Sequence, residues 1–325
     1  MKYFITGATG FVGGVLARKL RGQGHEVHAS VRSPEKAKDL EALGISIFKG
    51  DVTNKESMRE AMTGTDGVFH VAGWYKIGTR DKSGGEKINI KGTRNVLELM
   101  QELKIPKGVY TSTLAVNSDT HGEIVDESYH FTGKHLSEYD RTKAVAHDIA
   151  NEFITNGLPL VIVMPGVIYG SGDTSTLRDN LLDFLQGRLP AIPNRTSYCP
   201  AHVEDIIQGH ILAMEKGAIG DTYIIAGDPC TAQELFRIAS QVSGKPAPMT
   251  VPYQIMKAMS VLVKPFDSLM SQTYTSEGLR IIGGPTYLGD NSKAKRELGY
   301  NPRPVSEGWV ETIKHEMDLL GMNKP

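Results

Sequence analysis

KYFITGATGFVG, residues 2–13, places a short apolar run directly before three glycines spaced three residues apart. A helical pattern follows at once, because Val12, Leu16 and Leu20 recur every four residues. This order predicts a strand, a glycine turn and a helix N-terminus, which open the first βαβ unit of a dinucleotide-binding domain. Glycines let the backbone approach a pyrophosphate, and the helix N-terminus offers free N–H groups to it. The alternative is a glycine-rich turn that holds no ligand.

The composition narrows the classes of partner and compartment. With 325 residues, 40% of them hydrophobic, the chain is long enough for one large α/β domain or for a large and a small one. Its 36 basic and 37 acidic residues are interspersed, so we expect a small-molecule substrate and neither nucleic acid nor a membrane as partner. We expect no signal peptide, and no apolar run approaches the roughly 18 residues of a spanning helix. Cys199 and Cys230 lack metal-site spacing, which predicts no bound metal and a reduced, cytoplasmic setting.

Short β-like runs alternate with helical patterns through residues 1–170. This alternation predicts the α/β class with a doubly wound parallel sheet, that is, a Rossmann domain that binds the dinucleotide. The expected strands are 2–6, 26–31, 45–48, 67–71, 107–112 and 159–164. The expected helices are 12–23, 34–43, 55–63, 87–104 and 138–156.

The rest of the chain has a looser pattern. We expect residues 171–325 to form mainly a small C-terminal substrate lobe, with Rossmann elements returning within 203–230. Helical patterns occur at 177–186, 203–216 and 231–243, and a strand-like run occurs at 221–226. The tail, 249–325, is more irregular, although apolar residues recur every three to four positions from Met256 to Met270. Such a stripe is typical of a core, and in a substrate lobe it would also form a pliable apolar wall.

Two side chains that can move a proton are spaced four residues apart in YDRTK, residues 139–143. On a helix this spacing puts Tyr139 and Lys143 on one face, and an ammonium beside a phenol lowers the pKa of the phenol. Tyr139 would then exchange a proton with a substrate oxygen. Thr113, at the end of an expected strand, would hydrogen-bond the same oxygen. An ordinary pair on a helix surface is the alternative.

Short motifs occur in the order seen in extended short-chain dehydrogenases/reductases. They are Thr6-Gly7-x-x-Gly10-x-x-Gly13, Asp51-Val52, His70-Val71-Ala72, Asn89-x-x-Gly92-Thr93, Thr111-Ser112-Thr113, Tyr139-x-x-x-Lys143 and His202-Val203-Glu204-Asp205. Over essentially its whole length the chain resembles this group, which belongs to the NAD-dependent epimerase/dehydratase family. It looks most like the dihydroflavonol reductase-like branch, whose members reduce ketones or aldehydes on apolar molecules.

The resemblance implies a role for each matched position. Tyr139 is implied to be the catalytic acid/base, Lys143 to hold the ribose and tune Tyr139, and Thr113 to orient the substrate oxygen. Besides Tyr139 and Lys143, the positions implied to bind the cofactor are Gly7, Thr9, Gly10, Phe11, Val12, Asp51, Val52, Ala72, Gly73, Asn89, Pro165 and Ile168. The family also leads us to expect a homodimer through the helices near 90–104 and 138–156.

Two departures from the family argue against sugar-nucleotide chemistry. Members that bind nucleotide sugars usually carry an arginine for the diphosphate where this chain has Tyr198, although Arg195 lies nearby in the sequence. Sugar dehydratases place Asp-Glu where this chain has Leu114-Ala115, so elimination lacks its acid and base. A nucleotide-sugar epimerase with tightly bound NAD is still an alternative. So is a non-catalytic NADP-sensing protein, although such proteins typically lose the Tyr or the Lys.

The end of the second expected strand favours NADP over NAD. NAD enzymes usually carry an acidic residue there for the ribose 2′-hydroxyl, whereas this chain has Ser30-Val31-Arg32-Ser33. The cation of Arg32 suits the 2′-phosphate of NADP, and a solvated loop residue is the alternative.

Trp74 and Tyr75 follow the Val71-Ala72-Gly73 turn at the expected mouth of the cleft. They would stack on a flat substrate, with Tyr198 as a further contact, or they would pack in the core. Together these features predict an NADP(H)-dependent oxidoreductase that interconverts a carbonyl and an alcohol on a small apolar substrate.

Overall fold

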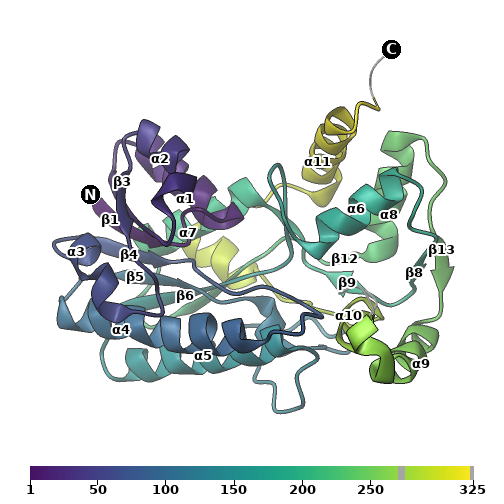
Figure 1. The fold of residues 1–325 in the computed structure, drawn as a ribbon, viewed down its shortest axis with the longest axis horizontal. Helices are drawn as coiled ribbons and strands as arrows, with labels where there is room; N and C mark the ends of the chain where they lie inside the picture. Colours follow the sequence, from purple (N-terminus) through teal and green to yellow (C-terminus); the bar gives the residue numbers. More distant parts are fainter. Residues whose placement is uncertain (270–274, 323–325) are drawn as a thin grey trace.

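A seven-stranded parallel sheet organises the molecule (Figure 1). The computed structural model describes residues 1–269 and 275–322. The strand order is β11-β6-β5-β4-β1-β2-β3, and every neighbouring pair is parallel. The strands are β1 Lys2–Thr6, β2 Glu26–Val31, β3 Ser46–Lys49, β4 Gly67–His70, β5 Gly108–Thr111, β6 Leu160–Pro165 and β11 Thr222–Ile225. The order reverses between β1 and β4, and doubly wound folds bind ligands at the carboxyl ends of such strands.

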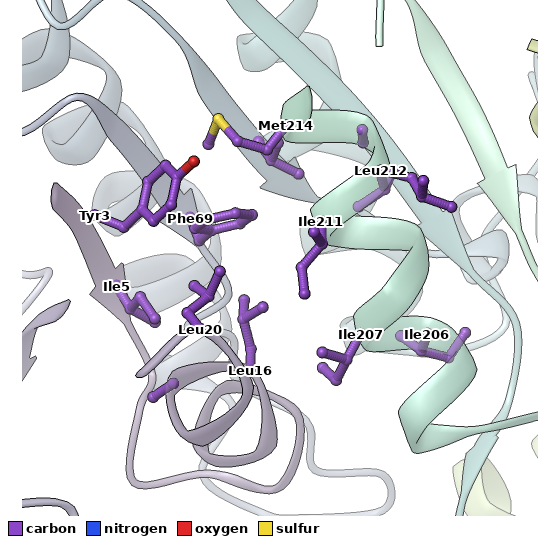
Figure 2. Packing of buried hydrophobic residues seen from close by; sticks show 14 of the residues in the cluster. Tyr3, Ile5, Leu16, Leu20, Phe69, Ile206, Ile207, Ile211, Leu212 and Met214 are labelled. Carbon is purple, nitrogen blue, oxygen red and sulfur yellow. The ribbon is translucent and has the colours of Figure 1, made fainter. Parts of the chain in front are cut away.

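Helices cover both faces of this sheet (Figure 1). One face carries α1 (Phe11–Gly22), α2 (Lys38–Ala42) and α7 (Val203–Lys216). The other carries α3 (Arg59–Met62), α4 (Thr93–Glu102) and α5 (Glu138–Thr155). Figure 2 shows Leu16 and Leu20 of α1 packed between the sheet and Ile207 and Ile211 of α7. The sheet is therefore buried on both sides, as parallel sheets usually are.

A smaller lobe with its own core stands beside the sheet (Figure 1). Its helices α6 (Thr176–Leu185), α8 (Ala232–Ser243) and α11 (Val305–Leu319) enclose Phe184, Leu235 and Trp309. Short strand pairs join its segments: β7 (Ile168–Tyr169) with β10 (Ala201–His202), β9 (Ser197–Tyr198) with β12 (Cys230–Thr231), and β8 (Ala191–Pro193) with β13 (Met249–Val251). Helices α9 (Tyr253–Leu262) and α10 (Ser276–Ile282) pack on each other at its outer end.

The predicted fold class is confirmed, and most element bounds agree with the structure to within one residue. The expected strands 2–6 and 26–31 are β1 and β2. The expected helix 87–104 instead divides into a π-helical segment, Gly85–Gly92, and α4. The helices expected at 34–43 and 55–63 each begin with a 3₁₀ turn, Pro34–Lys36 and Lys55–Met58.

The tail is more regular than its sequence pattern predicted, so that expectation was wrong. It contains α9, α10 and α11. In α11, Trp309, Ile313 and Met317 recur every four residues and all three are buried, so packing against the lobe core fixes this helix. Within the described residues, the longest and most apolar helices fall short of what crossing a membrane requires.

Candidate active site

A cavity of ≈ 780 Å³ lies at the carboxyl ends of the central strands. It runs from the glycine turn after β1 to Ile281 and Ile282 of α10 and to Tyr287. The predicted site residues line it, with the exception of Asn89. Those that line it are Gly7, Thr9, Gly10, Phe11, Val12, Arg32, Asp51, Val52, Ala72, Gly73, Trp74, Tyr75, Thr113, Tyr139, Lys143, Pro165, Ile168 and Tyr198. Positions spread over the chain thus meet in one place, while their roles stay predictions.

The glycine turn is packed so tightly that two of its positions exclude any side chain. Gly7 has φ +77°, and a Cβ there would lie 2.9 Å from Cα of Ala72. A Cβ on Gly13 would lie 2.3 Å from the carbonyl oxygen of Gly7. Helix α1 begins directly after Gly10 without a side-chain cap or an acidic residue in its first turn. Its first N–H groups therefore face the cavity, and this cradle fits the pyrophosphate of a dinucleotide.

The end of the cavity beside β2 and β3 carries polar groups, which lie at or just after the last residues of these two strands. The exposed side chain of Arg32 lines it beside Ser30. The Ser30 hydroxyl is buried and has no hydrogen-bond partner among the described residues. Asp51 accepts a hydrogen bond from the N–H of Thr53 through Oδ1 (2.8 Å), which holds this loop in place. This end of the cavity therefore holds a cation and a hydroxyl that has no hydrogen-bond partner among the described residues.

The residues predicted to transfer a proton line the same cavity. Ser137 caps α5 by accepting from the N–H of Asp140, so Tyr139 stands in the first turn of the helix. Burial raises the pKa of Tyr139, the nearby Tyr75 raises it further, and a hydrogen bond from Thr113 lowers it. Tyr139 and Thr113, predicted from separate segments, are thus in direct contact. A hydroxyl pair of this kind can hold one substrate oxygen.

The side chain of Lys143 makes hydrogen bonds to strand β5 of the sheet. Its Nζ donates to the carbonyl of Thr111 (2.7 Å) and to the hydroxyl of Tyr110 (3.1 Å). Burial lowers the pKa of Lys143 to about 7. From the sequence we expect Lys143 to lower the pKa of Tyr139. In this structure the ammonium donates to β5, and burial is the largest influence on the pKa of the phenol, so that expectation stays a prediction.

A chain of buried hydrogen bonds connects Lys143 to the glycine turn. Tyr110 bonds the hydroxyl of Thr93, which meets Nε2 of His70 (3.1 Å), and Nδ1 of His70 meets the hydroxyl of Thr6 (2.8 Å). Burial lowers the pKa of His70 to about 3, so the ring is neutral. The Thr6 oxygen accepts from the N–H groups of Val71 and Ala72 (both 3.1 Å), so its own proton goes to Nδ1. His70 must then carry its proton on Nε2.

Asn89 acts behind the cavity wall. It is almost fully buried. Its Oδ1 accepts from the N–H of Trp74 (2.7 Å), and its Nδ2 donates to the carbonyl of Trp74 (3.1 Å) and to the hydroxyl of Thr142 (2.9 Å). Any support of a cofactor by Asn89 would therefore pass through these neighbours. The Trp74 ring is also buried and lies where a Cβ on Gly84 would be. Tyr75 is 46% exposed and is the better placed of the two aromatic residues for a substrate.

The other end of the cavity, toward α10, is lined by apolar and aromatic side chains and also by polar ones, among them Asp173, Thr174, Ser175, Thr176 and Asn180. Leu177, Ile281 and Ile282 line it together with Tyr198 and Tyr287. The ring of Tyr75 meets that of Tyr139 edge to face, with centroids 4.9 Å apart.

Arg195 and Asp140 are two charged or ionisable groups that bear on a substrate at this end. Arg195 lies outside the cavity lining: it stacks on Tyr253 (5.1 Å) and pairs with Asp119 (3.6 Å). It therefore does not replace the arginine missing at Tyr198. Asp140 does line the cavity, accepts from the hydroxyl of Tyr287 (3.3 Å), and has its pKa raised to about 7 by burial.

Sequence reasoning missed several of these residues. Tyr287, Ile281 and Ile282 come from the tail and carry no motif. Asp140 stands beside Tyr139 in the sequence, and that adjacency was the available signal. No metal-binding cluster occurs among the described residues, and Cys199 and Cys230 are buried free thiols.

The glycine cradle, the switch-point cavity and the Tyr-Lys helix define a dinucleotide-dependent oxidoreductase site on a Rossmann fold. Comparison with known proteins gives the family. The NAD dependent epimerase/dehydratase family model matches residues 3–226, and the chain belongs to this family. It is an NAD(P)-dependent enzyme of the extended short-chain dehydrogenase/reductase type.

Several relatives match the chain over nearly its whole length. A putative dihydroflavonol 4-reductase of Synechocystis is 31% identical and covers 96% of this chain and 93% of its own. Sterol demethylase protein B of Methylococcus capsulatus is 28% identical (96% and 97%). The 4-hydroxy-2-methyl-3-oxo-4-farnesyl-3,4-dihydroquinoline-1-oxide ketoreductase of Stigmatella aurantiaca is 29% identical (97% and 96%).

Solved structures share the fold. The crystal structure of gox2253 has a TM-score of 0.83 at 28% identity and covers 99% of both chains. UDP-glucose 4-epimerase of Thermotoga maritima has a TM-score of 0.78 at 20% identity, covering 98% of this chain and 100% of its own. At that identity the likeness shows the fold alone.

Proposed function

We propose that this protein is an NADP(H)-dependent oxidoreductase that interconverts a carbonyl and an alcohol on a small apolar substrate. The observation that carries the proposal is the contact between Thr113 and Tyr139 inside a cavity whose outer end includes large apolar and aromatic side chains. Two hydroxyls at one point can bind a carbonyl oxygen, and the apolar and aromatic side chains of the outer end can bind the rest of the molecule.

The proposed roles follow from the chemistry of each group. Bound at the glycine cradle, the cofactor supplies or removes the hydride. Tyr139 gives its phenolic proton to the substrate oxygen in the reduction and takes it back in the oxidation. Thr113 orients that oxygen, and its hydrogen bond favours the phenolate left on Tyr139. Lys143 adds positive charge below its pKa of about 7 and, by the family resemblance, holds the ribose.

Two features at the β2 end support NADP over NAD. Arg32 is exposed at the cavity edge and makes no ion pair within residues 1–269 and 275–322. The unpaired hydroxyl of Ser30 lies beside it and can donate to a phosphate oxygen.

The alternatives have less support. An epimerase acting on a nucleotide sugar needs a cation for the diphosphate, and Arg195 is engaged with Tyr253 and Asp119. The relatives' names point to reductases, to a sterol and to a farnesylated quinoline oxide. A cofactor sensor without catalysis would not need Tyr139 and Lys143 together in the cavity.

Thermal-shift measurements test the proposal. NADPH should raise the melting temperature more than NADH, and a folded Gly10→Val variant should lose both effects, because its side chain occupies the space of the pyrophosphate. With NADP present, aromatic or terpenoid ketones and alcohols should stabilise the protein further. Strong stabilisation by UDP- or GDP-sugars would instead favour the epimerase.

The assembly expected from the family is proposed as well. A homodimer would form through the exposed sides of α4 and α5, and light scattering on the purified chain measures its mass directly. A monomer at micromolar concentration would contradict it.

A further inference from the structure

The outer face of the lobe exposes an unusual row of large apolar side chains. Ile255, Met259 and Leu262 lie on one side of α9, and Phe266 and Leu269 continue the row through the 3₁₀ turn Lys264–Leu269. With Val261 they form what we term the α9 face, whose members are 42% to 84% exposed. Monomeric proteins usually scatter such residues singly. Met270, which extends the same stripe in the sequence, lies outside the described residues.

The opposite side of α9 is firmly packed, so the helix cannot turn its apolar face inward. Ser260 is buried, and Tyr253 and Met256 lie against the backbone of the next helix. A Cβ on Gly284 would lie 2.5 Å from Cβ of Tyr253, and a Cβ on Gly283 would lie 3.0 Å from Cβ of Met256. Both sides of α9 therefore carry apolar side chains. Within the described residues, the side with Tyr253 and Met256 is packed against the protein and the α9 face is exposed.

The α9 face stands directly behind the wall of the cavity. Helix α10 packs on α9 and contributes Ile281 and Ile282 to the cavity lining. The two helices form the outer end of the lobe, away from the sheet (Figure 1). A molecule that leaves an apolar phase at the α9 face would thus have to pass α9 and α10 to reach the cavity.

The charges around the α9 face are mostly positive. Lys257 and Lys264 are exposed beside it, and Arg280 is exposed on α10. The carboxylate in this stretch, Asp267, accepts from the N–H and the hydroxyl of Ser276 (both 2.6 Å) and is under the influence of Arg280 and Lys264. An apolar row bordered by cations matches the acyl chains and anionic headgroups at the surface of a bilayer.

We propose that the α9 face rests in the interfacial layer of an anionic lipid bilayer, so that an apolar substrate dissolved there enters the cavity past α10. This rests on the proposed function for the nature of the substrate. The contact is peripheral, and it differs from the sequence-based expectation of no membrane partner. That expectation used the even distribution of charge, which does not reveal which side of an apolar helix is left exposed.

Vesicle flotation tests the proposal with the full chain. Wild-type protein should float with vesicles of phosphatidylcholine mixed with phosphatidylglycerol, and less with phosphatidylcholine alone. Leu262→Glu/Phe266→Glu should abolish flotation. Lys257→Glu/Lys264→Glu should weaken binding to the anionic vesicles by at least about tenfold, since each cation near such a surface contributes about fivefold.

The matched control places the same charges on apolar residues elsewhere. Leu43→Glu/Ile219→Glu changes two side chains that are 49% and 60% exposed, and it should float like the wild type. Melting temperatures of all variants should stay near the wild-type value, because the changed side chains are on the surface.

Two results would overturn the proposal. One is a wild-type protein that stays with the buffer in the presence of anionic vesicles. The other is a wild-type dimer that Leu262→Glu/Phe266→Glu converts to a monomer, because a second copy would then cover the α9 face. Flotation uses no turnover, so its outcome is separate from that of the proposed reaction. NADPH binding in solution, measured by calorimetry, should be equal in wild type and in Leu262→Glu/Phe266→Glu.

Discussion

The two ends of the cavity are built in opposite ways. At the dinucleotide end the contacts come from residues that directly follow consecutive strands, such as Gly7 after β1 and Arg32 after β2. At the substrate end they come from segments far apart in the chain, including Tyr75, Leu177 and Tyr287.

The two ends also differ in the space they leave for side chains and in the ionisable groups they contain. A Cβ on Gly7 or Gly13 has no space, whereas the substrate end is lined by large side chains and includes the buried carboxyl of Asp140. One end is thus shaped by backbone and the other by side chains. Substitutions should therefore separate into those that change cofactor binding and those that change substrate binding, with the residues proposed to be catalytic between them.

The largest effect should come from the residue at the boundary of the two ends. Tyr139→Phe keeps the ring and removes the proton, so turnover should fall by about 10² to 10⁴ while NADPH affinity stays the same. Tyr287→Phe, at the substrate end, should raise KM and change kcat little. Thr113→Ser should keep activity and Thr113→Val should lose most of it. A near-normal rate of single-turnover hydride transfer in Tyr139→Phe would mean that another group protonates the oxygen.

The substrate end should respond to pH through Asp140. Burial raises its pKa from 3.8 to about 7, so the native state holds this proton more firmly than the unfolded chain. Stability contributed by the protonated form is present at low pH and decreases as the pH rises from about 4 to 7. Replacing the group by Asp140→Asn should therefore help most at high pH.

Urea unfolding measures this effect as a difference. Between pH 5 and pH 8 the free energy of unfolding of Asp140→Asn should gain up to about 2.6 kcal/mol relative to wild type. Asp228→Asn changes an exposed carboxylate and should show no such gain. Equal pH dependence in Asp140→Asn and wild type would show that this carboxyl ionises freely in the folded protein.

The dinucleotide end should discriminate between cofactors through Arg32. Arg32→Ala should weaken NADPH binding by about 1.5–3 kcal/mol, the range of a charge-assisted hydrogen bond, and leave NADH binding nearly unchanged. Calorimetry with both cofactors measures this. Equal losses, or a wild-type preference for NADH, would remove the case for NADP.

The smallest effect concerns the hydrogen bond between Tyr110 and Lys143. Tyr110→Phe removes one acceptor of the ammonium, which costs about 0.5–1.5 kcal/mol and lowers the pKa of Lys143 by up to about one unit. The alkaline limb of the kcat profile should move to lower pH by that amount. Tyr223→Phe, whose hydroxyl accepts from the N–H of Ala218, is the control. An unmoved limb would make Tyr110 a packing residue only.

Sequence reasoning reached the dinucleotide end because local signals define it. The run before Gly7 predicted β1, and the spacing of Tyr139 and Lys143 predicted one helical face. These features depend on residues next to one another, so a single sequence displays them.

The substrate end depends on long-range packing and was largely out of reach. Trp74 and Tyr75 are adjacent, yet the indole is buried against Gly84 and the phenol is half exposed. Met256 packs against Gly283, while Met259, one turn later, faces outward. The stripe predicted a helix with an apolar side, and which side would be covered depended on where α10 returns.

The two glycines that follow Gly7 in the turn also differ in what they would tolerate over evolutionary time. A side chain at Gly13 would collide with the carbonyl oxygen of Gly7 at 2.3 Å whether or not a nucleotide is bound, whereas one at Gly10 would lie 3.3 Å from the same atom and project into the binding space. A descendant that gave up its cofactor would have to keep Gly13 to fold and would be free to lose Gly10. Gly10 is therefore the position whose replacement, in any descendant of this chain, would mark a lost ligand.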